Sequence, residues 1–303
     1  MIFGIYLKHC RKRYNLTQEE LVSKLYSFDD VFNGLDVRTL SRWENSQTNP
    51  PPNKQIHIIK FFTSFCDEIF PCFDDEANIE KHLCLKGIKN ILGHSKEHII
   101  NFPEDIFKVD DIEIKHLHLT DKVENLLEMP KEIFSTMTSD TFNITKEDLK
   151  RFASYPSNLF LVSEVKQQFM GMFFCLKLKP ISFEKLLSLE LKISDLEEKD
   201  FANASEKGSI FHLSFFSYNE MIASLFYIRY YAYLIKNQKY ILDIGTTAIL
   251  ESAKKLLEKL NIKHLKDIKY KDKNISIYKS TLEDVLLNES VLKALFTKQK
   301  CST

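Results

Sequence analysis

The sequence predicts an all-α domain at the N-terminus, followed by a mixed α/β domain. Apolar residues recur at helical spacing through residues 1–66. From about residue 109, short segments that alternate apolar and polar residues take turns with helical segments, which is typical of a mixed sheet. We therefore divide the chain into a helical domain at residues 1–66, a helical connector at 67–108 and an α/β domain at 109–303.

Composition places the chain among ordinary globular proteins of about two domains. Of its 303 residues, 44% are hydrophobic and 28% are charged, and only 7 are Gly. This is enough apolar material for two cores and too little glycine for a long flexible linker. The formal net charge of +0 argues against a protein that coats nucleic acid along its whole length, but it is compatible with a local basic face.

The apolar segments give no sign of secretion or membrane insertion. The first residues lack the apolar stretch and cleavage site of a signal peptide, and no run of about 18 apolar residues occurs. We therefore expect a cytoplasmic protein with reduced thiols and no membrane partner. Its cysteines are Cys10, Cys66, Cys72, Cys84, Cys175 and Cys301.

Four short helices are expected in the first domain, and the first two are amphipathic. Residues 2–14 place apolar side chains at helical spacing beside a cluster of Lys and Arg. Thr17 is followed three residues later by Glu20, a capping-box pattern that opens a second helix running to Leu25. The second helix is thus predicted to end before residues 26–35, a segment that contains a turn signal.

A third helix is expected to begin at Asp36, a good N-cap residue, and to run to Asn45. Leu40 and Trp43 share its buried face, whereas the opposite side is short, polar and basic. A side of that kind suits a helix laid into the DNA major groove. A fourth amphipathic helix follows the three prolines at residues 50–52.

Two strings in this domain resemble the Cro/C1 repressor-type helix-turn-helix family, also called the XRE family. They are LTQEEL at residues 16–21 and TLSRWENSQTNP at residues 39–50. The resemblance covers about a fifth of the chain and implies a homodimer that binds double-stranded DNA. The residues that it implies for DNA contact are Gln18, Val37, Arg38, Ser41, Arg42 and Asn45.

The family pattern also implies a role for each of these residues. Gln18 would touch phosphate and buttress the third helix. Arg38 would be the main reader of base edges, because Arg paired with guanine is the commonest specific contact. The pattern further implies base-edge contacts for Val37 and Ser41, backbone contacts for Arg42 and Asn45, core positions for Leu40 and Trp43, and a bracing role for Glu44.

The segment between the second and third helices departs from the family, which has a tight turn there. It spans residues 26–35 and contains Asn33-Gly34, a turn-forming pair. The insertion could bulge away from DNA or alter the angle at which the third helix docks. Asp29 and Asp30 would repel phosphate if they faced it.

The connector is expected to hold helices at residues 79–92 and 95–100 and to serve in dimerisation. His94 and His98 are four residues apart, so one helix face could present both imidazoles to a zinc ion. The nearby cysteines match no known ligand spacing, however, and scattered surface His and buried Cys are the preferred interpretation. We predict neither a metal site nor a cofactor.

The α/β domain is predicted from alternating elements. Strands are expected at residues 111–118, 158–165, 170–177, 208–216 and 240–244, with one or two more within 268–279. Helices are expected at residues 122–138, 145–153, 182–191, 218–236, 246–260 and 282–296. The strands on either side of residues 166–168 form a predicted hairpin.

This order of elements resembles the GNAT acyltransferase fold over about residues 109–280. A member of that family binds the pyrophosphate of acetyl-CoA on a glycine-containing loop, because the N–H groups of a helix N-terminus must approach the phosphates closely. Residues 217–224 occupy that place here, contain no glycine, and put the carboxylate of Glu220 where phosphate would sit. Acetyl-CoA binding is therefore expected to be lost.

Other candidate catalytic groups are sparse, and no catalytic residue is predicted. His212 and Glu190 could carry out acid–base work, although a histidine on a buried strand is more often a satisfied core residue. The Lys-rich run at residues 263–273 is interpreted as surface, with a phosphate-contacting face as the alternative. Three tyrosines of the long helix are expected in core and interface positions, namely Tyr227, Tyr230 and Tyr231.

The leading functional hypothesis is a sequence-specific transcriptional regulator. Its GNAT-like domain would be non-catalytic and would sense a small-molecule or protein effector or hold the dimer. The alternatives are a DNA-tethered N-acyltransferase and a DNA-binding antitoxin or immunity-type partner of another protein. The absence of glycine from residues 217–224 favours the regulator over the acyltransferase.

Overall fold

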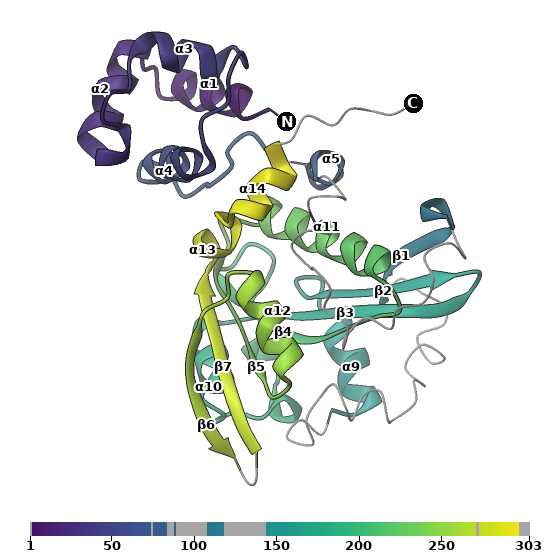
Figure 1. Cartoon of the computed structure of the whole chain (residues 1–303). Coiled ribbons are helices and arrows are strands. Elements are labelled where there is room, and N and C mark those ends of the chain that lie inside the picture. Colours follow the sequence, from purple (N-terminus) through teal and green to yellow (C-terminus); the bar gives the residue numbers. More distant parts are fainter. Residues whose placement is uncertain are drawn as a thin grey trace. The chain divides into compact units, whose positions relative to one another are not determined.

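The chain folds into two compact units (Figure 1). The first unit comprises residues 1–90, 231–239 and 286–303, and the second comprises residues 91–230 and 240–285. This computed structural model describes residues 2–73, 75–83, 88, 108–117, 144–270 and 273–296. Residues 286–296, which were predicted to be part of the α/β domain, belong to the first unit.

The described part of the first unit is helical. Its helices are α1 (Phe3–Arg13), α2 (Gln18–Phe28), the 3-10 turn η1 (Asp30–Phe32), α3 (Val37–Glu44), α4 (Pro52–Thr63), α5 (Glu76–His82) and α14 (Glu289–Phe296). The predicted capping box opens α2, since Thr17 and Glu20 bond each other's backbone N–H. Asp36 caps α3 by accepting from Thr39 N at 2.6 Å. The predicted helical N-terminal region is confirmed.

An aromatic cluster joins distant parts of the sequence inside the first unit. The ring of Phe296 in α14 lies 5.1 Å from that of Phe3 and 5.5 Å from that of Tyr6, between centroids. Phe70 lies 6.0 Å from Phe296, and the Gln238 side chain bonds both the N–H and the carbonyl of Phe70. All five side chains are buried, so the late segments of the chain complete this core.

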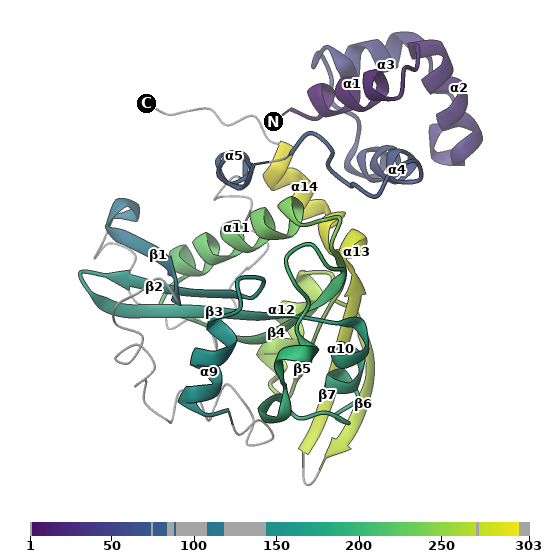
Figure 2. The same cartoon turned by 180° about the vertical axis from the view of Figure 1, so that it is seen from behind.

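The second unit is built on a mixed sheet (Figures 1 and 2) whose described strands run in the order β1-β2-β3-β4-β5-β7-β6. The strands are β1 (Ile112–His116), β2 (Leu159–Val165), β3 (Gln168–Leu178), β4 (Gly208–Ser217), β5 (Ile241–Ala248), β6 (His264–Tyr270) and β7 (Lys273–Thr281). Neighbouring strands are antiparallel except β4 and β5, which are parallel. The predicted mixed α/β class of this domain is confirmed.

The predicted hairpin is formed by β2 and β3. Lys166 and Gln167 connect the two strands with φ angles of 49° and 67°. Two consecutive residues with positive φ are what a type I′ turn requires, and that turn matches the twist of the strands on either side.

Helices cover both faces of the sheet. On β3, Phe174 shares a buried cluster with Phe152 and Phe183 of two helices, whereas the ring of its neighbour Phe173 lies 5.2 Å from that of Tyr227. Successive side chains of a strand point to opposite faces, so these contacts assign the helices to opposite layers. The helices are α9 (Lys146–Ala153) and α10 (Pro180–Leu187) on one face and α11 (Glu220–Lys236) on the other, with α12 (Glu251–Lys259) and α13 (Leu282–Leu286) later in the chain.

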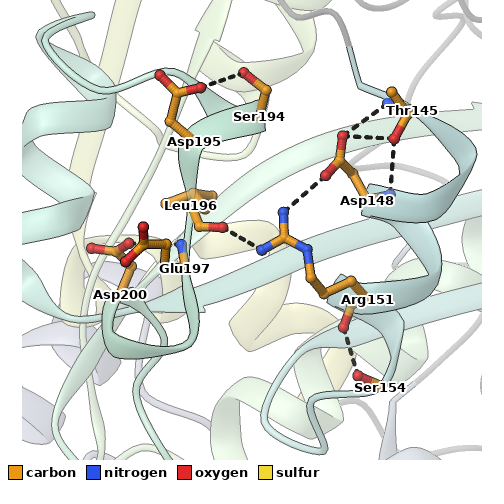
Figure 3. A network of polar contacts seen from close by, with 9 residues as sticks. All are labelled: Thr145, Asp148, Arg151, Ser154, Ser194, Asp195, Leu196, Glu197 and Asp200. Carbon is orange, nitrogen blue, oxygen red and sulfur yellow. Dashed lines mark hydrogen bonds and ion pairs between the residues drawn. The ribbon is translucent and has the colours of Figure 1, made fainter.

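A polar network fixes α9 to the segment that follows α10 (Figure 3). Arg151 Nη2 donates to Asp148 Oδ1 at 2.8 Å, and its Nη1 donates to the carbonyl of Leu196. Asp148 Oδ2 accepts from the backbone N–H and the hydroxyl of Thr145. Burial opposes ionisation of Asp148, but these bonds outweigh it and hold its pKa below the usual value.

Three predicted boundaries in the α/β domain are wrong. Residues up to Ala248 belong to β5 rather than to a helix, because they pair with β7, and α12 begins only at Glu251. Of the strands expected within 268–279, the first, β6, begins earlier, at His264, and includes most of the Lys-rich run, whose side chains are mainly exposed as expected of surface. The single helix predicted at 282–296 is divided into α13 and α14.

Several other predictions lie outside the described residues. They are the helices at 95–100 and 122–138, and the residues Cys84, His94, His98 and Cys301.

Candidate nucleic-acid interface and sheet cleft

A buried ion pair joins α1 to α3. Arg11 Nε donates to Glu44 Oε1 at 2.6 Å and its Nη2 donates to Glu44 Oε2 at 2.9 Å, a two-pronged geometry that favours Arg over Lys. Arg11 Nη1 also donates to the carbonyl of Leu16, which precedes α2. The Glu44 side chain is 1% exposed and that of Arg11 13%, so solvent screens the pair weakly. The hydrogen bonds with Glu44 raise the pKa of Arg11.

Gln18 belongs to the same cluster. Its Nε2 donates to Glu44 Oε2 at 2.8 Å, and its side chain is half-buried at the N-terminus of α2. This bond is the means by which α2 braces α3. The phosphate contact that the sequence analysis expects of Gln18 stays a prediction.

The other residues expected at DNA lie on α3 and its C-cap. Arg38 and Arg42 are one helical turn apart and exposed. Asn45, also exposed, lies 3.4 Å from Ser41 Oγ through its Nδ2. Val37 and Ser41 are partly exposed, whereas Leu40, Trp43 and Glu44 are buried. The structure therefore brings the expected DNA contacts to one side of α3 and the expected core residues to the other.

The insertion between α2 and α3 is folded. Phe32 of η1 is fully buried, and Asp29 Oδ2 lies 2.7 Å from His57 Nδ1 of α4. The other carboxylate oxygen of Asp29 accepts from Val31 N, and this bond is the main cause of a lowered Asp29 pKa. Gly34 ends the segment with φ of 79°. Asp29 is thus engaged with α4, while Asp30 is exposed.

Arg11 is the residue that sequence reasoning missed. It stands among Lys8, Lys12 and Arg13, which suggests a basic, solvent-facing cluster. The signal was its place in the helical pattern, one residue after the apolar Cys10, which puts it at the margin of the buried face.

In the second unit, β4 and β5 part midway along their length. Their pairing ends at Phe211 opposite Gly245, although the strands continue to Ser217 and Ala248. Thr246 Oγ1 donates to the carbonyl of His212 at 2.7 Å, just where the backbone pairing stops. The strands thereby leave a cleft of about 100 Å³. Its lining includes His212, Leu213, Ser214 and Phe215 of β4, Thr246, Thr247 and Ala248 of β5, and Leu256 and Leu257 of α12.

His212 is held neutral beside this cleft. Its Nε2 lies 2.6 Å from the hydroxyl oxygen of Tyr230, and burial lowers its pKa to about 4. The ring is hydrogen-bonded, as expected, but the side chain is partly buried and lines the cleft instead of lying in the core. The hydroxyl of Ser214 is buried and has no hydrogen-bond partner among the described residues. Glu190 is exposed and is not among the residues that line the cleft, so it does not accompany His212.

The N-terminus of α11 is capped by the chain itself. Asn219 Oδ1 accepts from Ile222 N at 2.9 Å, and Ser217 Oγ donates to the carbonyl of Asn219 at 2.7 Å. Asn219 is 1% exposed, and Glu220 follows as the first helical residue. A helix terminus with a side-chain cap and a carboxylate offers an approaching phosphate little attraction.

No group of three His, Cys, Asp or Glu side chains in the described segments is arranged to hold a metal ion. Within the same segments, the helices are too short or too polar to cross a membrane. Tyr227 and Tyr230 are buried against Phe173, in the core position expected of the tyrosines of α11.

No protein-family model and no curated protein matches this chain. Among solved structures, it is similar to an uncharacterized protein from Bacillus halodurans, with 16% identity over 61% of this chain and 90% of that chain, at a TM-score of 0.37. A GNAT-family acetyltransferase from Streptococcus pneumoniae has 11% identity over 56% and 98% of the two chains and a TM-score of 0.35. The AHL synthase LasI has 14% identity over 62% and 98% and a TM-score of 0.36. At these values the similarities carry no inference about activity.

Proposed function

We propose that the chain is a sequence-specific DNA-binding regulator whose first unit lays α3 in the major groove. The observation that carries the proposal is the sidedness of α3. Arg38 and Arg42 are exposed on one side, while Glu44 on the other is clamped by the two-pronged bond from Arg11. A reading helix needs free donors toward the bases and a rigid support behind it.

Arg38→Ala tests the docking of α3. A binding site is first selected from a pool of random duplexes with the full-length protein, and affinity is then measured by fluorescence anisotropy. The variant is expected to lose about 1–3 kcal/mol of specific binding and to relax preference at one base pair. Lys185→Ala, an exposed residue of α10, is the matched control. Unchanged affinity and preference in Arg38→Ala would refute this docking.

The proposal includes a homodimer on an inverted repeat, because regulators of this kind read two half-sites about one helical turn apart. Sedimentation of the protein with the selected duplex should give two chains per duplex. Affinity should fall steeply with salt as phosphate contacts release counterions. One chain per duplex on a selected site without a repeat would contradict the dimer.

For the second unit we propose a non-catalytic, GNAT-like domain that receives a small-molecule or protein effector. The support is the N-terminus of α11, where Asn219 caps the helix and Glu220 places a carboxylate. An alternative, a DNA-tethered N-acyltransferase, is favoured by one feature, the cleft where β4 and β5 part.

Titration of the full-length protein with acetyl-CoA in a calorimeter separates the two. We expect no heat of acetyl-CoA binding, because the N-terminus of α11 is already capped. Stoichiometric binding that Glu220→Gln strengthens would instead establish a nucleotide site and make the acyltransferase the leading function.

A further inference from the structure

A second cavity, of about 290 Å³, lies within the first unit. One wall is the loop between α3 and α4 together with the first turn of α4 and the residue before α1, and the other is α14. Its lining residues are Ile2, Ser46, Asn49, Pro52, Gln55, Glu289, Leu292, Lys293 and Phe296. Neither the DNA-facing residues nor the β4–β5 cleft shares any of them.

Ser46 is an unexpected residue at its position. It follows the C-cap of α3 with φ of 56°, and the bonds Ser46 N to Trp43 O and Gln47 N to Arg42 O complete a Schellman motif. Glycine is usual there, because other residues are strained at positive φ. Ser46 therefore places a hydroxyl on the wall of the cavity at a position where glycine would leave none.

The wall that carries Ser46 is firmly held. A Cβ on Gly4 of α1 would lie 2.1 Å from the Trp43 carbonyl oxygen and 2.9 Å from Ser46 Oγ, so α1 touches the end of α3 directly. Gln55 Nε2 donates to the carbonyl of Pro50 at 2.8 Å, which orients its amide. The amide of Gln55 is therefore oriented before any ligand arrives, which reduces the entropy lost on binding.

The lining defines the chemistry of an occupant. Ser46, Asn49 and Gln55 offer hydrogen-bond donors and acceptors, while Leu292 and Phe296 are apolar. Lys293 Nζ lies 2.6 Å from Glu289 Oε1, so the two charges of the lining neutralise each other and the cavity favours an uncharged occupant. Since a water molecule takes up about 30 Å³ of liquid, the space suits about ten non-hydrogen atoms.

We propose that this cavity binds an uncharged, hydrogen-bonding heterocycle of nucleobase size, with Ser46 Oγ and the Asn49 amide as its polar contacts. The site adjoins the C-terminal end of α3, which makes it a place where a small molecule can act on the DNA-binding unit. Ligand binding at the cavity is measured without DNA, so the result tests this proposal separately from the proposed DNA binding.

Adenine and nicotinamide serve as probes, observed by saturation-transfer NMR with the full-length protein. At least one is expected to bind the wild type with millimolar or tighter affinity. Ser46→Gly should weaken that binding about tenfold, as the loss of one hydrogen bond predicts. The first unit of the Ser46→Gly variant should nevertheless unfold at a temperature no lower than that of the wild type, because glycine relieves the strained φ.

Asn15→Gly is the matched control, since Asn15 also has positive φ, 53°, and does not line the cavity. It should leave probe binding unchanged. The fluorescence of Trp43, the single tryptophan, reports unfolding of the first unit in all three proteins. Binding of neither probe to the wild type, or equal binding by the wild type and Ser46→Gly, would overturn the proposal.

Discussion

The two units each contain a sheltered polar cluster, and the clusters differ in charge. In the first unit, Arg11 and Glu44 form an ion pair that also bonds Gln18. In the second, His212 and Tyr230 meet as neutral groups where β4 and β5 part. The first cluster owes its strength to paired charges, whereas the second avoids charge because burial disfavours the imidazolium. Removing one partner should therefore lower the stability of the first unit, and lowering the pH should lower the stability of the second.

Arg11→Ala should give the largest effect. It leaves the Glu44 carboxylate buried with its main partner gone, and such changes cost about 3–5 kcal/mol. Urea unfolding followed by Trp43 fluorescence reports the first unit selectively. The double variant Arg11→Ala/Glu44→Leu should recover part of the loss, because no buried charge remains. Equal losses in the single and double variants would show that packing of the Arg11 stem, and not the charge, holds α3.

Acidification should give the next largest effect, through His212. Its pKa is about 4 when folded and about 6.5 when unfolded, so below pH 6.5 the unfolded chain takes up a proton that the folded chain does not. Stability present above pH 6.5 is lost as pH falls toward 4, by about 2 kcal/mol between pH 7 and pH 5.

His212→Phe removes this titration while keeping a ring. Circular dichroism during urea unfolding at pH 7 and pH 5 should show the smaller acid loss in the variant. If wild type and variant lose the same stability over that pH interval, His212 does not stay neutral in the folded protein.

Arg151→Ala should give the smallest effect. Its side chain is 37% exposed, in contrast to the 13% of Arg11, so solvent screens its pair with Asp148. The expected loss is about 1 kcal/mol. Thermal unfolding followed by circular dichroism measures it, with Lys150→Ala, a partly exposed residue of the same helix, as a check on the helix itself. A loss as large as that of Arg11→Ala would mean that exposure does not set the strength of these pairs.

The parts of the fold that local patterns encode were predictable. Thr17 with Glu20 and Asp36 mark helix starts through bonds within one turn, and the β2–β3 hairpin follows from alternation around a short polar turn. The end of β5 was not predictable, because pairing with a distant strand decides it. The apolar side chains at helical spacing suggest a helix from residue 246, but the pairing of Ala248 with Ser276 keeps this segment extended.

The candidate site divides in the same way. The exposed side of α3 follows from helical periodicity, so the exposure of Arg38 and Arg42 was predictable, whereas their contact with DNA stays a prediction. Arg11 was not, because its partner Glu44 is 33 residues away and no local rule connects them. The cleft between β4 and β5 depends on where two strands part, which is a property of the sheet and not of either strand alone.

The contribution of α14 to the first unit has a consequence for synthesis of the protein. The aromatic cluster of Phe3, Tyr6 and Phe70 is completed by Phe296, and about 200 residues separate the N-terminal part of this unit from its last segment. At about 5–20 residues per second, a ribosome needs roughly 10–40 s to add them. During that interval the helices already made expose an unfinished core, so the N-terminal part of this unit is among the last parts of the protein to complete its packing.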